Sequence, residues 1–305
     1  MPQRLIAGLS RLKRYFRDRR ALYYYLNKAV RSPRLRRALH LLVRSVTPRA
    51  DAAAAAQEDT ARLRKDGIII RERLLDASTV DKIRRYLLAK PVYNLLEEYA
   101  EKGKTPLRLD EVAITRQTKL KYFDADIAGC REIVDLANSP EILSLVSAYL
   151  GCKPTIANMA AWWTKAGNGS PEKFYDDMFH RDVDDYKFLK LFVYLNDVAA
   201  GNGAHCFVRG SHISGKLTAR RTFTDEEIDQ NFDKSDRLVL TGKSGCGFLE
   251  DTWGLHRSMP CVEGERLVLH FLYSLTSLNA QTTPKPVAKN TYGVDAYTNR
   301  VYLYP

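Results

Sequence analysis

The sequence lacks several features that would place the chain in a simple class. No apolar run approaches the roughly 18 residues of a transmembrane helix. Arginines interrupt every apolar stretch near the N-terminus, which argues against a signal peptide. The five cysteines are widely spaced and form no CxxC pair, so they indicate neither a disulfide framework nor a zinc site. No internal repeat is evident. What remains indicates a globular protein with 45% hydrophobic residues and reduced thiols, as expected in the cytoplasm.

Acidic residues are almost absent from the first 50 positions. This leader contains 14 Lys and Arg but a single acid, Asp18, whereas the rest of the chain has 34 basic and 35 acidic residues. The formal net charge of +12 therefore originates in the leader and not in the main domain.

The leader is predicted to form helices that Ser32-Pro33 separates. Its apolar residues recur at helical spacing: Leu5, Leu9, Leu12 and Phe16, then Leu35, Leu39, Leu42 and Val46. A basic amphipathic helix can lie on an anionic membrane surface. Nucleic acid is a weaker alternative, because no recognition motif accompanies the charge. A solvated extension, or a helix packed on its own domain, fits the pattern at least as well.

Helices are expected mainly in the first half of the chain and strands in the second. The expected helices are 52–64, 79–89 with Ser78 as N-cap, and 139–150, which Gly151 ends. The expected strands are 68–70, 155–164, 188–195, 205–208, 247–251 and 266–273. This order predicts an α+β domain built on a double-sheet barrel, with flanking helices and a basic helical N-terminal extension. The predicted boundaries are 1–56 for the extension, 57–283 for the domain and 284–305 for a C-terminal tail.

Three side chains in the strand-rich half can bind one metal ion. His180 and Asp182 are two residues apart, and residues i and i+2 of a strand point to the same side. His256, from a distant strand, can close one face of an octahedron and leave the remaining positions for a cosubstrate and O2. The pattern indicates a facial Fe(II) site.

Two cations are candidates for holding a carboxylate near this metal. Arg266 lies ten residues after His256, and a guanidinium holds a carboxylate bidentately and stays charged when buried. Lys190 interrupts an apolar strand and shares a face with Phe188 and Phe192 by alternation. A buried lysine needs an anionic partner, which can be a bound cosubstrate anion or an internal carboxylate. Alternatively, the amine reaches the edge of the barrel.

Four groups of motifs follow one another along the chain: Phe179-His180-Arg181-Asp182; the stretch 190–198; Asn202-Gly203-Ala204-His205 with Gly210-Ser211-His212; and the stretch 250–256 with Gly264-Glu265-Arg266. As an ordered set over roughly residues 60–280, they resemble the phytanoyl-CoA dioxygenase family. The resemblance implies a double-stranded β-helix, the jelly-roll or cupin-like barrel. It implies Fe(II) bound by His180, Asp182 and His256, and 2-oxoglutarate bound through its C5 carboxylate by Arg266, with Lys190 as a second contact.

The reaction implied is the hydroxylation of an unactivated C–H bond, with succinate and CO2 as coproducts. The presence of Asp182 favours hydroxylation over halogenation, whereas desaturation and epimerisation stay open. The expected substrate is a small molecule or a lipid- or glycan-type compound. The expected location is cytoplasmic, with the leader at the inner face of the membrane as a further option.

Other side chains are weaker candidates for the substrate pocket. We assign Arg181, Trp163 and His270 to it, although each also fits a structural role. His270 shares a strand face with Arg266, one of the adjacent Trp162 and Trp163 must face inward, and Arg181 should point away from the metal. His205 is interpreted as a core or edge residue and His212 as a turn residue. Lys119 and Lys121 are weakly supported cosubstrate contacts.

Two other functions stay open. The first is a cupin-like enzyme that uses a metal without 2-oxoglutarate, against which Arg266 and Lys190 argue. The second is an inactive module that the basic leader recruits to a membrane, against which the intact triad argues.

Overall fold

A seven-stranded antiparallel sheet forms the centre of the computed structural model, which describes residues 19–50, 57–95, 98, 103–114, 116–167, 175–278 and 286–305. Its strand order is β1-β8-β5-β10-β4-β3-β2. The strands are β1 (Ile68–Arg71), β2 (Val92–Asn94), β3 (Thr118–Tyr122), β4 (Thr155–Lys165), β5 (Phe188–Tyr194), β8 (Gly247–Glu250) and β10 (Glu265–Ser274). All the strands expected from the sequence are present in this sheet or the next, within a residue or two at their ends.

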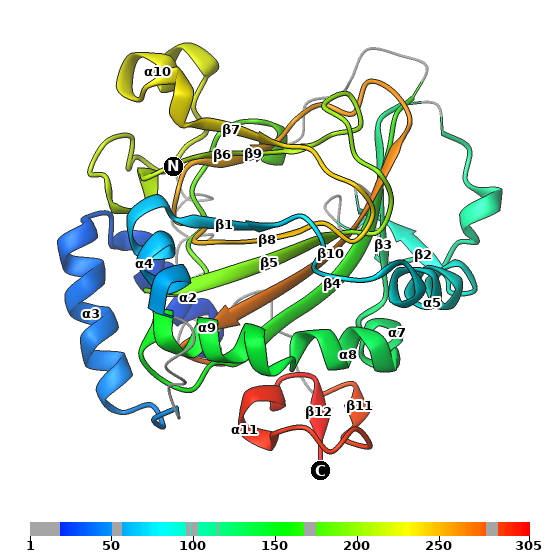
Figure 1. The fold of residues 1–305 in the computed structure, drawn as a ribbon, viewed down its shortest axis with the longest axis horizontal. Coiled ribbons are helices and arrows are strands. Elements are labelled where there is room, and N and C mark those ends of the chain that lie inside the picture. Colours follow the sequence, from blue (N-terminus) through cyan, green and yellow to red (C-terminus); the bar gives the residue numbers. More distant parts are fainter. Residues whose placement is uncertain are drawn as a thin grey trace, which may run out of the picture.

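A smaller sheet lies above the large one in the view of Figure 1. It has the order β7-β6-β9 and comprises β6 (His205–Val208), β7 (Arg237–Leu240) and β9 (His256–Ser258). From β5 onward the chain passes back and forth between the two sheets. Among the described residues no continuous ladder joins them, so the architecture observed is two antiparallel sheets and not a closed barrel.

Helices cover the face of the large sheet that points away from the small sheet (Figure 1). They are α5 (Ala77–Leu88), α7 (Asp124–Ala128), α8 (Arg131–Ala137) and α9 (Pro140–Leu150). Ser139 caps α9, and Gly151 ends it in a left-handed conformation with φ +74°, as expected. The N-cap of α5 is Asp76 and not Ser78, because the Asp76 carboxylate accepts the hydrogen bond from the Thr79 amide. The remaining helices are α4 (Gln57–Asp66), α10 (Asp225–Asn231) and α11 (Ala296–Asn299).

Strand β5 shows how the two faces of the large sheet differ. Leu189, Leu191 and Val193 enter the large core beneath the helices. Phe188, Lys190 and Phe192 alternate with them and point to the other face, toward the small sheet. Polar side chains gather on that second face, and the candidate site is there.

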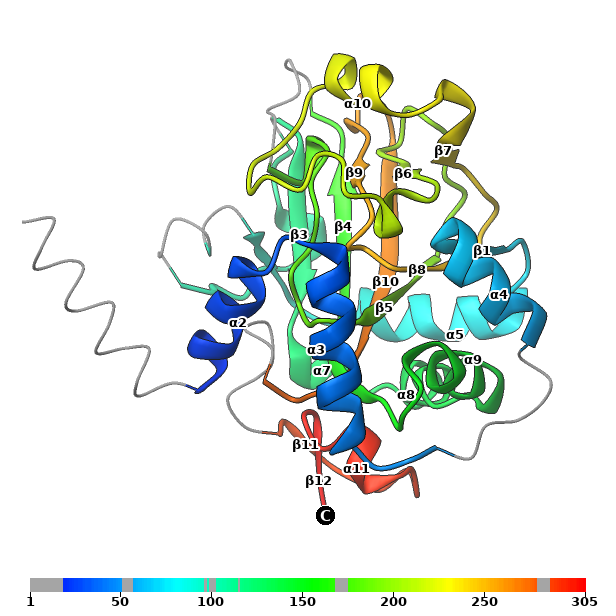
Figure 2. The ribbon, with the colours of Figure 1, turned by 90° about the vertical axis from the view of Figure 1, so that its left-hand side faces the viewer.

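The described part of the leader packs on the domain as helices α2 (Arg19–Ala29) and α3 (Pro33–Ser45), visible in Figure 2. Ser32 caps α3 and Pro33 is its first residue, which agrees with the predicted break. The buried Arg36 donates hydrogen bonds to the backbone carbonyls of Asn27, Val30 and Asp185. The first predicted leader helix and Ala52–Ala56 lie outside the described residues. Within the described ranges, no helix combines the length and apolar character that a membrane crossing needs.

The C-terminal segment also contributes to the core. Strands β11 (Ala288–Lys289) and β12 (Leu303–Tyr304) form a parallel pair. Tyr302 is buried, and its hydroxyl group bonds to both the amide and the carbonyl of Met159 in β4. The predicted tail at 284–305 therefore includes residues that pack against the large sheet, while the domain boundaries themselves stay a prediction.

Candidate metal centre

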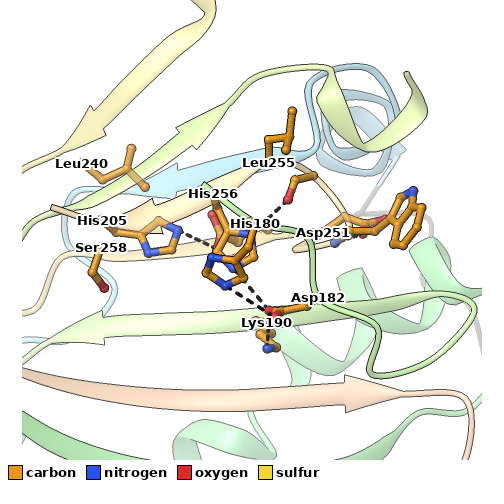
Figure 3. Close-up of polar contacts among 12 residues, drawn as sticks. His180, Asp182, Lys190, His205, Leu240, Asp251, Leu255, His256 and Ser258 are labelled. Carbon is orange, nitrogen blue, oxygen red and sulfur yellow. Dashed lines mark hydrogen bonds and ion pairs between the residues drawn. The ribbon is translucent and has the colours of Figure 1, made fainter. Parts of the chain in front are cut away.

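The structure brings His180, Asp182 and His256 together between the two sheets (Figure 3). His180 and His256 face each other across an antiparallel bridge, with reciprocal backbone hydrogen bonds of 3.0 and 3.1 Å. The Asp182 amide donates to the Thr252 carbonyl at 2.9 Å, which fixes the aspartate beside the histidines. One ligand atom from each side chain lies within 4.8 Å of the other two. Main-chain pairing alone thus assembles the predicted triad.

Both histidines are held in the tautomer that a metal requires. Nδ1 of His180 lies 2.8 Å from the Met178 carbonyl oxygen, and Nδ1 of His256 lies 3.0 Å from that of Gly254. A carbonyl only accepts, so each Nδ1 carries a proton and Nε2 is the atom of each ring that is left for a metal ion. Burial would lower the pKa of His256, but the Asp182 carboxylate raises it overall, so a metal ion competes with a proton for this Nε2. The Nε2 atoms lie 3.7 Å (His180) and 3.3 Å (His256) from the Asp182 carboxylate oxygens.

Burial and the neighbouring His256 lower the pKa of His180 to about 4, so its ring is neutral at neutral pH. A neutral imidazole is the form that binds a metal ion. The aspartate is ionised in turn: burial opposes the charge, but the Lys190 ammonium outweighs it and holds the pKa of Asp182 well below its usual range.

Lys190 contacts protein carboxylates. Its Nζ lies 2.6 Å from Asp182 Oδ2 and 2.8 Å from Asp184 Oδ2 (Figure 3 shows the first contact). Burial alone would lower the pKa of Lys190, but the two carboxylates raise it instead. Of the partners that the sequence left open for Lys190, the structure shows the internal carboxylate. Lys190 therefore orients a triad residue, and a direct contact with a cosubstrate stays a prediction.

Arg266 has the surroundings expected of a carboxylate-binding arginine. It is buried on β10 and donates to the Gly203 carbonyl, and its Nη2 lies 3.4 Å from the hydroxyl oxygens of Thr164 and Ser258. Its Nε–H has no acceptor among the described residues. A buried donor without a partner is costly, and an incoming anion can supply the acceptor. Ser258 lies two residues beyond His256 on β9, so this strand supplies both a triad ligand and a contact of Arg266.

A row of rings lines the same space. His256 stacks on His205 at 5.5 Å, His205 contacts Phe192 at 5.1 Å, and Phe192 contacts His270 at 4.9 Å. His270 lies on the face of Arg266, as predicted, and burial lowers its pKa well below its usual range, which keeps it neutral. His205 Nε2 lies 2.8 Å from Glu250 Oε1, a buried contact that no spacing in the sequence predicts.

Trp163 was the wrong choice between the two tryptophans. Its ring belongs to the core beneath the helices, and its indole N–H donates to the Tyr122 hydroxyl at 2.9 Å. Trp162 occupies the site face, 5.8 Å from His270. Position 162 is thus the residue that can wall a substrate pocket.

The assignment of Arg181 to the substrate pocket also needs correction. It points away from the triad, as expected, but its guanidinium donates to the backbone carbonyls of Ser211, Lys216, Leu217 and Trp253. Burial lowers its pKa to about 9. With its donors engaged by carbonyls, Arg181 holds the 211–217 loop against the segment that precedes His256.

The two weakly supported lysines lie on the site face of β3, opposite Thr164 and Trp162 of β4. Lys119 is paired with Asp176 and Asp177 at 3.5 and 3.6 Å. His212 bonds through Nε2 to the Arg64 carbonyl at 3.2 Å, which fits the structural role expected for it.

No protein-family model matches the sequence, and no curated protein matches it either. The fold does match solved structures. EctD from S. alaskensis, crystallised with 2-oxoglutarate and 5-hydroxyectoine, is 18% identical with a TM-score of 0.53, over 85% of this chain and 89% of that one. SnoN, described as a non-heme alpha-ketoglutarate-dependent epimerase of nogalamycin biosynthesis, is 20% identical with a TM-score of 0.50, over 72% and 82%.

At this level of identity the likeness concerns the fold. The chain has the mixed helix-and-sheet fold, with a large antiparallel sheet, of these 2-oxoglutarate-dependent enzymes.

Proposed function

We propose that this protein is an Fe(II)- and 2-oxoglutarate-dependent dioxygenase. In this proposal it hydroxylates an unactivated C–H bond of a small-molecule or lipid- or glycan-type substrate, and succinate and CO2 are the coproducts. The observation that carries the proposal is the triad, in which two Nε2 lone pairs and one carboxylate converge within 4.8 Å. This donor set, on one face, suits non-haem Fe(II). The two sheets around it would be the halves of a jelly-roll barrel.

The residues present fit both cofactors. Fe(II) would be held by His180, Asp182 and His256, and 2-oxoglutarate by the metal and by Arg266, whose Nε lacks an acceptor. When bound, the metal and cosubstrate would supply the oxidising chemistry, so no acid–base side chain is required. The printed names of EctD and SnoN mention 2-oxoglutarate or alpha-ketoglutarate, which supports this choice of cosubstrate. The finer assignment to the phytanoyl-CoA dioxygenase family stays a prediction.

The protein's own contribution is to position the metal ligands and the cosubstrate and to keep water away from them. Nδ1 hydrogen bonds orient the two imidazoles, and Lys190 fixes the Asp182 carboxylate. Thr164 and Ser258 orient the Arg266 guanidinium. The ring row from His205 to His270 provides an apolar wall on which a cosubstrate chain can pack.

The test is anaerobic titration with Fe(II) and 2-oxoglutarate, followed by exposure to O2 and measurement of succinate. The full chain should bind both and release succinate, slowly without substrate. Asp182→Ala should weaken metal binding by at least tenfold, because even the loss of a group that only supports a metal ligand typically weakens binding by about that factor. Asp197→Ala, an exposed aspartate paired with Lys243, is the matched control and should leave both unchanged.

Arg266→Gln separates the proposal from the 2-oxoglutarate-independent alternative. Metal binding should survive in this variant, while the affinity for 2-oxoglutarate should fall by more than tenfold. Metal binding by the unmodified chain without any succinate would favour a cupin-like enzyme of another kind. Failure to bind either ligand would favour the inactive module.

We also propose that the leader contacts an anionic membrane surface. The favouring observation is that three apolar side chains of this segment point outward: Leu35 and Leu42 of α3 are 50% and 65% exposed, and Val46, the C-cap of the helix, is 82% exposed. Arginines flank these side chains on the same helix. Apolar and basic groups together suit the boundary between anionic headgroups and acyl chains.

Flotation with phosphatidylcholine–phosphatidylglycerol vesicles tests this contact. The double variant Leu35→Ser/Leu42→Ser should float less than the full chain. Leu88→Ser, at a 50% exposed leucine on α5, is the control and should not change flotation. Equal flotation of all three proteins would contradict the membrane contact.

A further inference from the structure

A cavity lies outside the metal centre, where the leader helix α3 meets the domain. It has a volume of about 650 Å³, within the range usual for ligand sites. Residues of α3, α4, α9 and the 251–253 segment line it, and Figure 2 shows α3 beside the other two helices. None of the three triad residues lines this cavity.

The cavity is strongly basic. Five arginines and one lysine line it, together with two histidines and a single acid: Arg34, Arg36, Arg37, Arg44, Arg64, Lys187, His40, His212 and Asp251. Burial lowers the pKa of His40 and of His212, so the fixed charge comes from the arginines and the lysine.

The single acid is already engaged. Asp251 Oδ2 accepts from the Tyr149 hydroxyl at 2.7 Å and from Lys187 Nζ at 3.1 Å, and Oδ1 accepts from the Trp253 amide. The Lys187 ammonium lowers the pKa of Asp251 despite its burial, so this pair is internally neutral. Asp251 therefore leaves the arginine charges uncompensated.

The arginines at the mouth have no carboxylate partner of their own. Within the described ranges, no ion pair joins Arg34, Arg37, Arg44 or Arg64 to an acid, and all four are exposed. Gly151 makes room for one of them, because a Cβ there would lie 2.7 Å from Nη1 of Arg44. The deeper Arg36 stacks on the Trp253 ring at 3.9 Å and holds the helix in place. The exposed arginines thus form a positively charged entrance to the cavity, and Arg36 lies deeper.

We propose that this cavity binds a phosphate group of a phosphorylated ligand. Several guanidinium groups around one concavity match the oxygens of a terminal phosphate, as in a phosphate monoester, better than those of a single carboxylate. Leu41 and Ile213, both exposed at the cavity wall, offer an apolar surface for the organic part of the ligand. Lipid headgroups and soluble phosphate esters both carry the required chemistry.

The first experiment is calorimetric titration of the full chain with inorganic pyrophosphate at low ionic strength. The Arg37→Gln/Arg44→Gln variant should bind at least tenfold more weakly than the unmodified chain. Arg62→Gln/Arg85→Gln removes the same charge from exposed helix positions outside the cavity and should bind as the unmodified chain does. A repeat in His180→Ala separates the cavity from the metal centre, and binding should persist there.

The second experiment identifies the source of the phosphate. Vesicles of phosphatidylcholine with phosphatidic acid are compared with phosphatidylcholine–phosphatidylglycerol vesicles of equal charge. Pyrophosphate binding in solution that the cavity variant weakens supports a soluble ligand. Selective binding to phosphatidic acid vesicles that the same variant abolishes supports a lipid phosphate. Equal loss in the two arginine variants, or no binding in either arm, overturns the proposal.

This inference does not depend on the oxygenase activity, because both measurements detect binding and neither requires turnover. A protein that fails to form succinate can still bind pyrophosphate here, and the converse also holds.

Discussion

The metal triad and the basic cavity lie at opposite ends of the short segment from Asp251 to His256, and they treat charge in opposite ways. At the triad, Lys190 is buried and sits between Asp182 and Asp184. At the cavity, four arginines are exposed and pair with no acid among the described residues, and the only carboxylate in the lining is engaged by Lys187 and Tyr149. Burial requires compensation, because an uncompensated buried charge costs several kcal/mol. Solvent exposure removes that requirement.

At the triad the protein itself balances the charge of Lys190, whereas the cavity keeps an excess of positive charge that a bound anion would balance. Around the triad, hydrogen bonds occupy the polar atoms of His180, His256 and Asp182 except for those that would bind a metal ion. Around the cavity, water screens the arginines until an anion replaces it. Three variants test this difference, in order of decreasing expected effect.

The largest effect is expected for Lys190→Met in the metal-free protein. Removing the ammonium leaves the partly buried Asp182 and the buried Asp184 as neighbouring carboxylates, and breaking a buried pair in this way costs about 3–5 kcal/mol. Urea unfolding followed by tryptophan fluorescence would measure the loss. The control is Lys165→Met, whose partner Glu265 is 42% exposed, and it should cost less than about 1 kcal/mol. Similar small losses in both variants would show that Lys190 is not needed for charge balance.

An intermediate, pH-dependent effect is expected for Asp185→Asn. Asp185 is a buried acid held by neutral donors, including the Tyr23 hydroxyl and the amides of Leu275 and Thr276, and burial raises its pKa to about 6. The folded protein thus binds this proton more tightly than the unfolded chain does. The stability from Asp185 is full below about pH 4 and is lost as the pH rises through 6.

The variant has no such titration. The unfolding free energy of the natural protein, minus that of Asp185→Asn, should therefore fall by roughly 2–3 kcal/mol between pH 4 and pH 7. Denaturant unfolding of both proteins at several pH values measures this difference. A difference that rises with pH would mean that the carboxylate is stabilised as an anion, as Asp182 is.

The smallest effect is expected for the stability of Arg37→Gln/Arg44→Gln. Both side chains are exposed and lack an acid partner within the described ranges, so the free energy of unfolding should change by no more than about 0.5 kcal/mol. Any change should be a gain, because crowding of like charges is relieved. A loss above about 1 kcal/mol in thermal denaturation would show that these arginines hold α3 in place.

The triad was predictable because it depends on local geometry. The two-residue spacing of His180 and Asp182 places both on one side of an extended segment, and the ordered motifs pointed to His256. The tautomers of the histidines were not predictable, because they depend on local backbone conformations that bring the carbonyls of Met178 and Gly254 against the rings. The partner of Lys190 was not predictable either, since alternation gives the face of a side chain but not its neighbour.

Two misreadings have physical causes. Ala160-Ala161-Trp162-Trp163 is apolar at every position, so alternation could not tell the site face from the helix face, and Trp163 was taken for Trp162. In α3 the apolar stripe was recognised, yet part of it points outward while Arg36 is buried against the domain. An amphipathic pattern normally faces its core. This helix departs from the rule because backbone carbonyls and the Trp253 ring receive the arginine.

The segment from Asp251 to His256 connects the two sites along the chain. Asp251 and Trp253 form part of the cavity wall, the Trp253 carbonyl is tied down by Arg181, and His256 ends the segment as a metal ligand. If an occupant of the cavity changes the metal affinity by some factor, the metal must change the affinity of the cavity for that occupant by the same factor. Titrating either ligand in the presence of the other would therefore measure the same coupling free energy between the two sites.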